Sequence, residues 1–147
     1  MDLILWRHAD AEDGRDDAAR RLTPKGAMQA AQMAAWLESR LPENAKLLVS
    51  PAVRAQQTAE RLTREAITSE QVKTGAQPAD ILRAAGWPAG RGTVVVVGHQ
   101  PTLGAAAALA LTGTATPWQM QKGSIWWIST RGDPGPVVVA VMTPDLL

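Results

Sequence analysis

The chain has 147 residues, of which 46% are hydrophobic and 20% are charged, with a formal net charge of +1. This length fits one folded domain with a substantial core, and the balanced charge excludes a general attraction to nucleic acid or to a membrane surface. The lack of cysteine excludes disulfides, thiolate catalysis and zinc held by cysteine.

The first expected element is a short apolar run, residues 3–6, which ends abruptly in Arg7 and His8. A run without polar alternation is typical of a strand buried on both faces, as in a parallel sheet. Such strands present functional side chains at their carboxyl ends. We therefore expect Arg7 and His8 to project from one edge of the sheet.

A highly charged segment, residues 10–17, follows and lacks apolar periodicity, which predicts a mobile surface loop. Thr23 and Pro24 then form a typical helix start, an N-cap followed by a first-turn proline. Apolar residues at steps of three and four predict a helix up to Pro42, with one buried stripe of Ala27, Ala30, Ala34, Leu37 and Leu41.

A second short strand is expected at residues 46–49, followed by Ser50 and Pro51 as another N-cap and first-turn proline. The next helix would carry Arg54 in its first turn, beside the end of that strand. Its predicted apolar face consists of Ala55, Ala59, Leu62 and Ala66.

The rest of the chain reads as further strands and helices, although residues 68–90 give the weakest pattern. The valine run at residues 93–97 predicts a central strand that ends at Gly98 and His99. The other expected elements are a short edge strand at 71–73, helices at 80–85 and 101–111, and an antiparallel hairpin of strands 124–129 and 137–142.

Strands that alternate with helices and end in a hairpin predict an α/β fold, a three-layer sandwich with helices on both sides of a mostly parallel sheet. We expect a single domain over residues 1–147. No apolar run approaches the ~20 residues that a membrane span needs, and the N-terminus lacks a basic lead with an apolar signal core. These features predict a cytoplasmic protein.

Three strand exits share one design, in which an apolar strand is followed by polar residues and a helix start. Parallel strands would bring Arg7, His8, Arg54 and His99 to the same edge of the sheet, beside several helix N-termini. The paired N–H donors of an arginine guanidinium and the free backbone N–H groups of a helix start are suited to bind a doubly charged phosphoryl group. The sequence therefore predicts a phosphoryl site.

These motifs resemble those of the histidine phosphatase superfamily, which has the phosphoglycerate-mutase-like fold. Arg7 and His8 resemble its Arg-His-Gly signature. The other similar segments are Ser50-Pro51 with Arg54 and Gln57-Thr58, then Gly98-His99, and the stretch Arg21-Leu22-Thr23 with Gly26, which is similar to the short SixA-type phosphohistidine phosphatases.

The resemblance implies a role for each site residue. His8 would be the nucleophile and form a phosphohistidine intermediate, with its other ring nitrogen bonded to a backbone carbonyl. Arg7 and Arg54 would bind phosphoryl oxygens, with His99, if it is protonated, as a third donor and Arg21 as a fourth. No metal or other cofactor is expected, because these side chains supply the positive charge.

Two departures from the family pattern bear on this prediction. Position 9 is alanine where the signature has glycine, a change that is harmless only if the backbone there has a negative φ. No residue stands out as the general acid that many members use to protonate the leaving group. The carboxylates considered are Glu65, Glu70 and Asp80 in the middle of the chain and Asp10 and Glu12 in the charged segment.

The lack of an evident acid favours phosphohistidine on a protein as the substrate, since an imidazole leaves more readily than an alkoxide. The partner expected from the resemblance is a phosphorylated protein such as a histidine phosphotransfer domain. Two alternatives stay open: a phosphatase of small phosphomonoesters with the same fold, and a non-catalytic module that binds phosphoryl groups. Neither nucleic acid nor a membrane is expected as a partner.

Overall fold

The computed structural model describes residues 1–147 and contains one six-stranded sheet with the strand order β3-β2-β4-β1-β5-β6. The first four strands of the chain are parallel, whereas β5 runs antiparallel to β1 and β6 antiparallel to β5. The strands are β1 (Asp2–Arg7), β2 (Lys46–Val49), β3 (Ala66–Thr68), β4 (Thr93–Gly98), β5 (Ile125–Ser129) and β6 (Val137–Met142).

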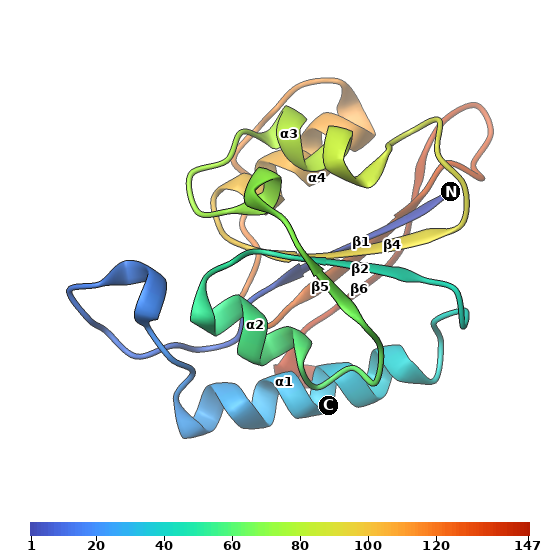
Figure 1. Ribbon diagram of the computed structural model, residues 1–147. Coiled ribbons are helices and arrows are strands. Elements are labelled where there is room, and N and C mark those ends of the chain that lie inside the picture. The colour runs from blue at the N-terminus through green and yellow to red at the C-terminus, as the bar shows by residue number, and fades with distance from the viewer.

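Helices cover both faces of this sheet, so the predicted α/β sandwich is confirmed. Helices α1 and α2 lie on one face, and α3 and α4 on the other (Figure 1). Their bounds are α1 (Pro24–Glu38), α2 (Val53–Ala59), α3 (Pro78–Ala85) and α4 (Thr102–Thr112), with 3-10 turns η1 (Asp17–Ala19), η2 (Glu70–Val72) and η3 (Pro144–Leu146). None of the helices has the length and apolar character to cross a membrane.

The centre of the sheet is apolar on both faces because β1 and β4 are sandwiched between the helix layers. In β1, Leu3 and Leu5 pack towards α3 and α4, while Ile4 and Trp6 pack towards α1 and α2, and all four side chains are fully buried. Full burial of each of the three aliphatic side chains contributes about 1.5–3 kcal/mol relative to exposure. Packing against both helix layers therefore fixes the positions of the carboxyl ends of β1 and β4.

Helix α1 begins as predicted. The Thr23 hydroxyl accepts a hydrogen bond from the Gly26 N–H at 2.9 Å, and Pro24 occupies the first turn. The helix ends at Glu38, before the predicted stop at Pro42, because the Arg40 and Leu41 N–H groups turn back to the Leu37 carbonyl. The buried stripe contains Ala30, Met33, Ala34 and Leu37, whereas Ala27 and Leu41 are partly buried.

The segment after β2 differs from the prediction at both of its ends. Ser50 is not the N-cap of α2, which begins at Val53 with no side-chain cap. The Ser50 hydroxyl instead accepts from the Ala52 N–H at 3.2 Å and contacts His99. Leu62 is buried as expected but lies beyond α2, which ends at Ala59, and Ala66 is exposed and belongs to β3. The assignment of these two residues to the helix was therefore wrong.

The remaining elements confirm the prediction except at one edge. The edge strand is β3, not residues 71–73, which fall in η2 and the residue after it. The helix predicted at 80–85 is α3, the helix predicted at 101–111 is α4, and the hairpin is β5–β6. Short polar segments such as residues 66–73 have too little periodicity to predict where an edge strand pairs.

Sheet register brings three strand exits together. Arg7 in β1 lies opposite Gly98 in β4, and Val49 in β2 lies opposite Val97. The next residues continue this pairing, since the His8 N–H donates to the Gly98 carbonyl at 3.0 Å and the Ser50 N–H to the Val97 carbonyl at 3.1 Å. In Figure 1 the charged segment after β1, in blue, projects beyond the carboxyl ends of these strands.

Candidate active site

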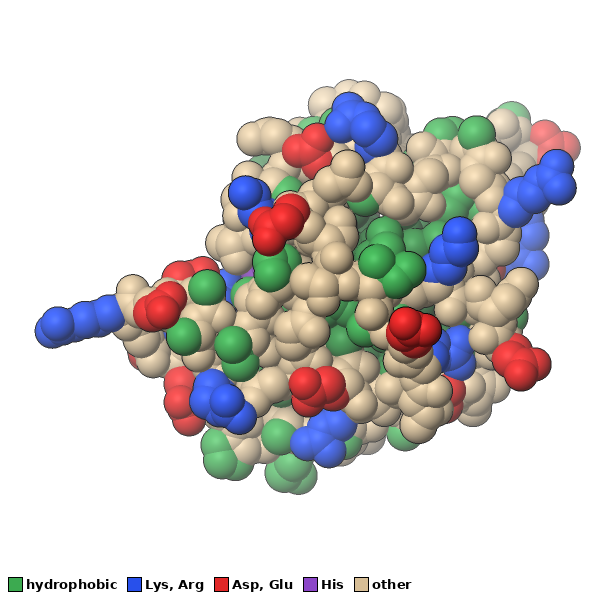
Figure 2. All heavy atoms as spheres, viewed as in Figure 1, with side chains coloured by type: hydrophobic (Ala, Val, Ile, Leu, Met, Phe, Trp, Pro, Cys, Tyr) green, Lys and Arg blue, Asp and Glu red, His purple; other side chains and the backbone are tan.

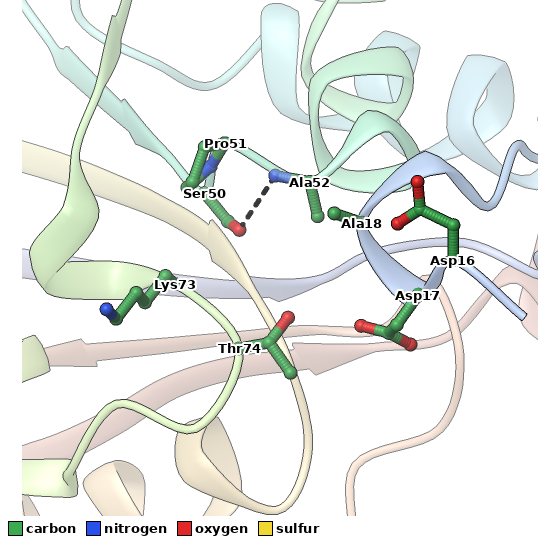
Figure 3. Close-up of a pocket in the computed structure, with 8 residues that line it drawn as sticks. All are labelled: Asp16, Asp17, Ala18, Ser50, Pro51, Ala52, Lys73 and Thr74. Carbon is green, nitrogen blue, oxygen red and sulfur yellow. Dashed lines mark hydrogen bonds between the residues drawn. The ribbon is translucent and has the colours of Figure 1, made fainter.

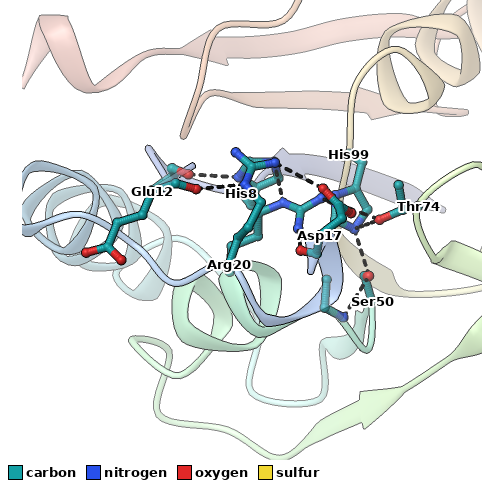
Figure 4. Close-up of polar contacts among 10 residues, drawn as sticks. His8, Glu12, Asp17, Arg20, Ser50, Thr74 and His99 are labelled. Atoms are coloured by element: carbon teal, nitrogen blue, oxygen red, sulfur yellow. Dashed lines mark hydrogen bonds and ion pairs between the residues drawn. The ribbon is translucent and has the colours of Figure 1, made fainter. Parts of the chain in front are cut away.

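Arg54 is the centre of a buried cluster at the carboxyl ends of the parallel strands, and only 3% of Arg54 is exposed. Its Nε lies 3.3 Å from His8 Nε2, and its Nη2 lies 3.3 Å from His99 Nδ1. The same guanidinium donates to the Asp17 carbonyl at 2.7 Å and to the Asp17 carboxylate at 3.1 Å, and it approaches the Thr74 hydroxyl at 3.5 Å. Figure 4 shows these polar contacts.

The contacts of His8 select one tautomer of its ring. Nδ1 lies 2.7 Å from the Ala9 carbonyl, which can only accept, so Nδ1 carries the proton. Nε2 therefore has a free lone pair, and Arg54 Nε donates to it. The expected backbone carbonyl is confirmed, and it leaves the nitrogen that faces Arg54 unprotonated.

Burial lowers the pKa of His8 from 6.5 to about 3, with further lowering from His99, Arg54 and Arg7 nearby. The imidazole is consequently neutral at pH 7. A neutral ring with a free Nε2 lone pair has the form that a nitrogen nucleophile requires.

His99 lies beside His8, with ring centroids 5.3 Å apart. Because its Nδ1 faces the donor Arg54, its proton belongs on Nε2, which donates to the Ser50 hydroxyl at 2.7 Å and lies 3.4 Å from the Thr74 hydroxyl. Burial, and then the charge of Arg54, lower the pKa of His99 to about 4. His99 is thus neutral in the free protein, and it would be the expected third donor only after taking up a proton.

These two imidazoles should make the protein sensitive to acid. The pKa of His8 is about 3 in the folded chain against 6.5 when exposed, so below pH 6.5 the unfolded chain binds a proton that the folded chain does not. The free energy of unfolding is therefore expected to decrease as the pH falls from 6.5, by about 3 kcal/mol at pH 4 from His8 alone. Urea denaturation from pH 7 to 4 measures this decrease.

The control for this experiment is the His8→Asn variant, because Asp10, Asp17 and Glu38 also have lowered pKa values and add their own acid sensitivity. The variant retains those carboxylates and loses only the imidazole. Its stability should decrease less steeply with acid than that of the wild type. Parallel curves for the two proteins would contradict the buried, neutral state of His8.

Asp17, which the sequence analysis did not single out, connects the charged segment to the cluster. Its carboxylate contacts both Arg54 and Arg20, at 3.1 Å each. Arg20 also donates from Nε to the Glu12 carbonyl at 2.7 Å. Hydrogen bonds from Arg20 and Arg54 lower the pKa of Asp17, so its carboxylate is ionised at neutral pH.

Arg7 is partly buried and donates from Nη1 to the Met120 carbonyl at 2.7 Å. Its Nε is buried and has no hydrogen-bond partner. Burial lowers the pKa of Arg7, although not enough to remove its charge at neutral pH. Arg7 thus supplies an unpaired buried donor from the same strand end that carries His8.

Arg21 is not part of the cluster. It is exposed, its side chain forms no hydrogen bond or ion pair, and it lines a separate hollow with Gln57, Glu60 and Arg61. Its neighbour Arg20 points to Asp17 instead. The expected fourth phosphate donor is therefore absent from the site in this structure, because adjacent residues of an extended segment point in opposite directions.

The carboxylates considered as general acids lie elsewhere. The Asp10 carboxylate accepts hydrogen bonds from Thr23 and Lys122, which engage it outside the histidine cluster. The hydrogen bond from Lys122 is the main cause of the lowered pKa of Asp10. The side chain of Glu12 points away from the cluster in Figure 4. Glu65 and Glu70 are exposed, and Asp80 caps α3 and pairs with Arg83.

The alanine at position 9 is accommodated without strain. No residue other than glycine has a positive φ, so Ala9 adopts an ordinary backbone conformation. Its N–H donates to the Thr58 hydroxyl at 3.1 Å, and its carbonyl orients His8. The departure from the glycine of the signature is thus harmless for the backbone.

A pocket of about 340 Å³ borders the cluster (Figure 3). The residues that line it are Asp16, Asp17, Ala18, Ser50, Pro51, Ala52, Lys73 and Thr74. Figure 2 shows acidic and basic side chains interspersed over one face of the molecule, with no large area of one sign. The face in this view therefore has no broad basic surface, in line with the balanced composition.

Comparisons with known proteins identify the family. The family model of the histidine phosphatase superfamily (branch 1) matches residues 3–76. The phosphohistidine phosphatase SixA of Escherichia coli (strain K12) is 40% identical over 63 residues, a match that spans 42% of this chain and 39% of that protein. An uncharacterized protein of Picosynechococcus sp. is 35% identical over 136 residues, which cover 85% of this chain and 82% of that protein.

A solved structure supports the same assignment over the whole chain. The protein histidine phosphatase SixA complexed with tungstate superposes with a TM-score of 0.81 at 26% identity, and 99% of each chain is covered. The fold is thus the phosphoglycerate-mutase-like fold expected from the motifs. Together with the matched family model, these similarities show that the chain belongs to the histidine phosphatase superfamily.

Proposed function

We propose that the chain is a phosphatase that uses His8 as its nucleophile. His8 Nε2 would attack the phosphorus atom, so that an Nε2–P bond forms while the bond from phosphorus to the leaving group breaks and the leaving group takes the electron pair. Water would then attack the phosphohistidine, release inorganic phosphate and restore neutral His8. The observation that supports this proposal most strongly is the neutral His8 ring, whose free Nε2 faces Arg54.

Arg54 and Arg7 would stabilise the charge that develops on the phosphoryl oxygens. A guanidinium buried to 3% exposure with a single carboxylate partner retains an attraction for further negative charge. The unpaired Nε of Arg7 offers another donor. In this proposal these arginines supply the positive charge that metal ions supply in other phosphoryl-transfer sites.

The proposed substrate is phosphohistidine on a protein, as the name of the similar SixA protein also suggests. An alkoxide leaving group needs a proton donor, yet Asp17, the carboxylate in contact with Arg54, has a lowered pKa and is ionised. A phosphorylated imidazole can carry a proton on its other ring nitrogen, and in that form it leaves as neutral imidazole without a proton from the enzyme. The weak acid function of the site therefore favours phosphohistidine over alkyl phosphates.

A substrate panel tests this choice. The wild type and the Asp17→Asn variant are assayed with a histidine-phosphorylated protein, an alkyl phosphate and an aryl phosphate. We expect kcat/KM to be highest for the phosphohistidine protein, and kcat on it to change by less than about threefold in Asp17→Asn. A decrease of about 100-fold, the size of a lost acid catalyst, would show that Asp17 donates the proton after all.

The same panel separates the two alternatives. Higher kcat/KM on the small esters than on the phosphoprotein would assign the chain to the phosphatases of small phosphomonoesters. Binding of inorganic phosphate without turnover of any substrate would assign it to the non-catalytic binding modules.

A further inference from the structure

A second hollow, of about 350 Å³, lies between the start of α1 and the end of α2. The residues that line it are Arg21, Leu22, Ala27, Gln57, Glu60 and Arg61. None of them belongs to the His8–Arg54 cluster. The hollow is therefore a separate concave surface near the proposed active site.

This second hollow offers donors without partners. Arg21 and Arg61 are exposed and form no ion pair or hydrogen bond through their side chains, whereas Arg20, Arg54 and Arg64 each pair with a carboxylate. Glu60 is the only acidic residue in the lining and pairs with neither arginine.

An amide group adds to these donors. The side-chain oxygen of Gln57 accepts from the Leu22 N–H at 2.8 Å, and its NH₂ group has no hydrogen-bond partner and is free to donate. The hollow thus has one net positive charge and several unused donors, a composition that suits a carboxylate.

Helix α2 sets the distance between this hollow and the phosphoryl site. Arg54 lies in its first turn, and the five residues from there to its end at Ala59 correspond to about 7.5 Å along the axis. Arg61 lies two residues further, in the turn after the helix. A small phosphate ester is too short to reach both places. An extended peptide covers the same distance in about three residues.

We infer that the second hollow is a docking subsite for an acidic side chain of the phosphorylated protein substrate. This inference depends on the proposed function, because it places the phosphorylated side chain at His8. The carboxylate binds Arg21 and Arg61 and accepts from the Gln57 amide. Arg21 then serves substrate recognition at a distance from the reacting phosphorus atom.

Two phosphohistidine peptides of otherwise identical sequence test the subsite. One carries glutamate at the third and fourth positions on each side of the phosphohistidine, and the other carries glutamine there. At low ionic strength we expect kcat/KM of the wild type to be about fivefold higher for the acidic peptide, as two exposed ion pairs allow. The preference should disappear in the double variant Arg21→Gln, Arg61→Gln, while turnover of p-nitrophenyl phosphate stays unchanged.

The matched control is the double variant Lys46→Gln, Arg91→Gln. It removes the same amount of charge from two exposed residues. Lys46 and Arg91 lie at the amino ends of β2 and β4, whereas the proposed active site lies at the carboxyl ends. It should keep the fivefold preference, which separates local docking from a general charge effect. Equal kcat/KM for both peptides in the wild type, or an equal loss in both double variants, would overturn the subsite.

A binding measurement keeps this test independent of catalysis. The His8→Asn variant, which lacks the proposed nucleophile, should bind the acidic peptide about fivefold more tightly than the neutral one. If the wild type hydrolyses neither peptide, the proposed function fails, and the two dissociation constants still decide whether the subsite exists. Equal dissociation constants would refute it.

Discussion

Replacing His8 with asparagine is expected to reduce kcat roughly 10⁴-fold or more and to abolish labelling of the enzyme by a ³²P-phosphorylated substrate. The reason is that Nε2 of His8 is the only imidazole lone pair that both lies at the end of β1 and has its tautomer fixed by a carbonyl. Rapid acid-free quenching and gel electrophoresis measure the labelled enzyme, and circular dichroism shows whether the fold persists.

The matching variant is His99→Asn, since His8 and His99 are the only two histidines of the chain. His99→Asn should still form the labelled enzyme, although more slowly, because it removes a neighbour of the phosphoryl group and not the nucleophile. Labelled enzyme in His8→Asn, or its absence from His99→Asn alone, would transfer the nucleophilic role to His99.

The second large effect is expected at Arg54. Substitution by alanine removes the charge that contacts both histidines and leaves the Asp17 carboxylate without this partner. We expect kcat/KM to decrease by about 10³–10⁵, the range found for arginines that stabilise phosphoryl-transfer transition states. Arg54→Lys restores the charge without the planar fork and should recover only part of this loss. Steady-state kinetics with the phosphohistidine protein measure both variants.

Arg64 provides the control for this substitution. Like Arg54, it donates to a backbone carbonyl, that of Pro42, and pairs with a carboxylate, that of Glu38. Arg64→Ala should therefore lower stability but leave kcat/KM nearly unchanged. Similar activity in Arg54→Ala and Arg64→Ala would mean that the guanidinium of Arg54 has only a structural role.

The parts of the fold that could be predicted are those encoded by local patterns. The apolar runs before His8 and His99 have no polar alternation, and this pattern indicated buried central strands. The Thr23-Pro24 pair indicated the start of α1, and the glycine- and proline-rich gap after β5 indicated a hairpin. Each signal lies within a few residues of the element it describes, so no knowledge of distant contacts is needed.

Edge elements escaped prediction because they depend on distant partners. Strand β3 has three exposed residues and exists because it pairs with β2. The helix after Ser50 begins later than the local cap signal indicated, since the Ser50 hydroxyl is engaged by His99, 49 residues away. Such a hydrogen bond contributes about 0.5–1.5 kcal/mol, which is as much as a capping preference of about 1 kcal/mol, so the local cap signal alone does not fix where the helix begins.

The sequence by itself determined which strands are central and which residues lie at or just after strand ends, namely Arg7, His8, Arg54 and His99. The reason is that runs of apolar residues without polar alternation indicate buried, parallel strands. Only the tertiary structure decided that Arg20 and not Arg21 faces the cluster, that Asp17 pairs with Arg54, and that both imidazoles are neutral. The physical reason is that side-chain direction in an irregular segment and desolvation in a buried cluster depend on neighbours from other parts of the chain, which no local pattern of residues specifies.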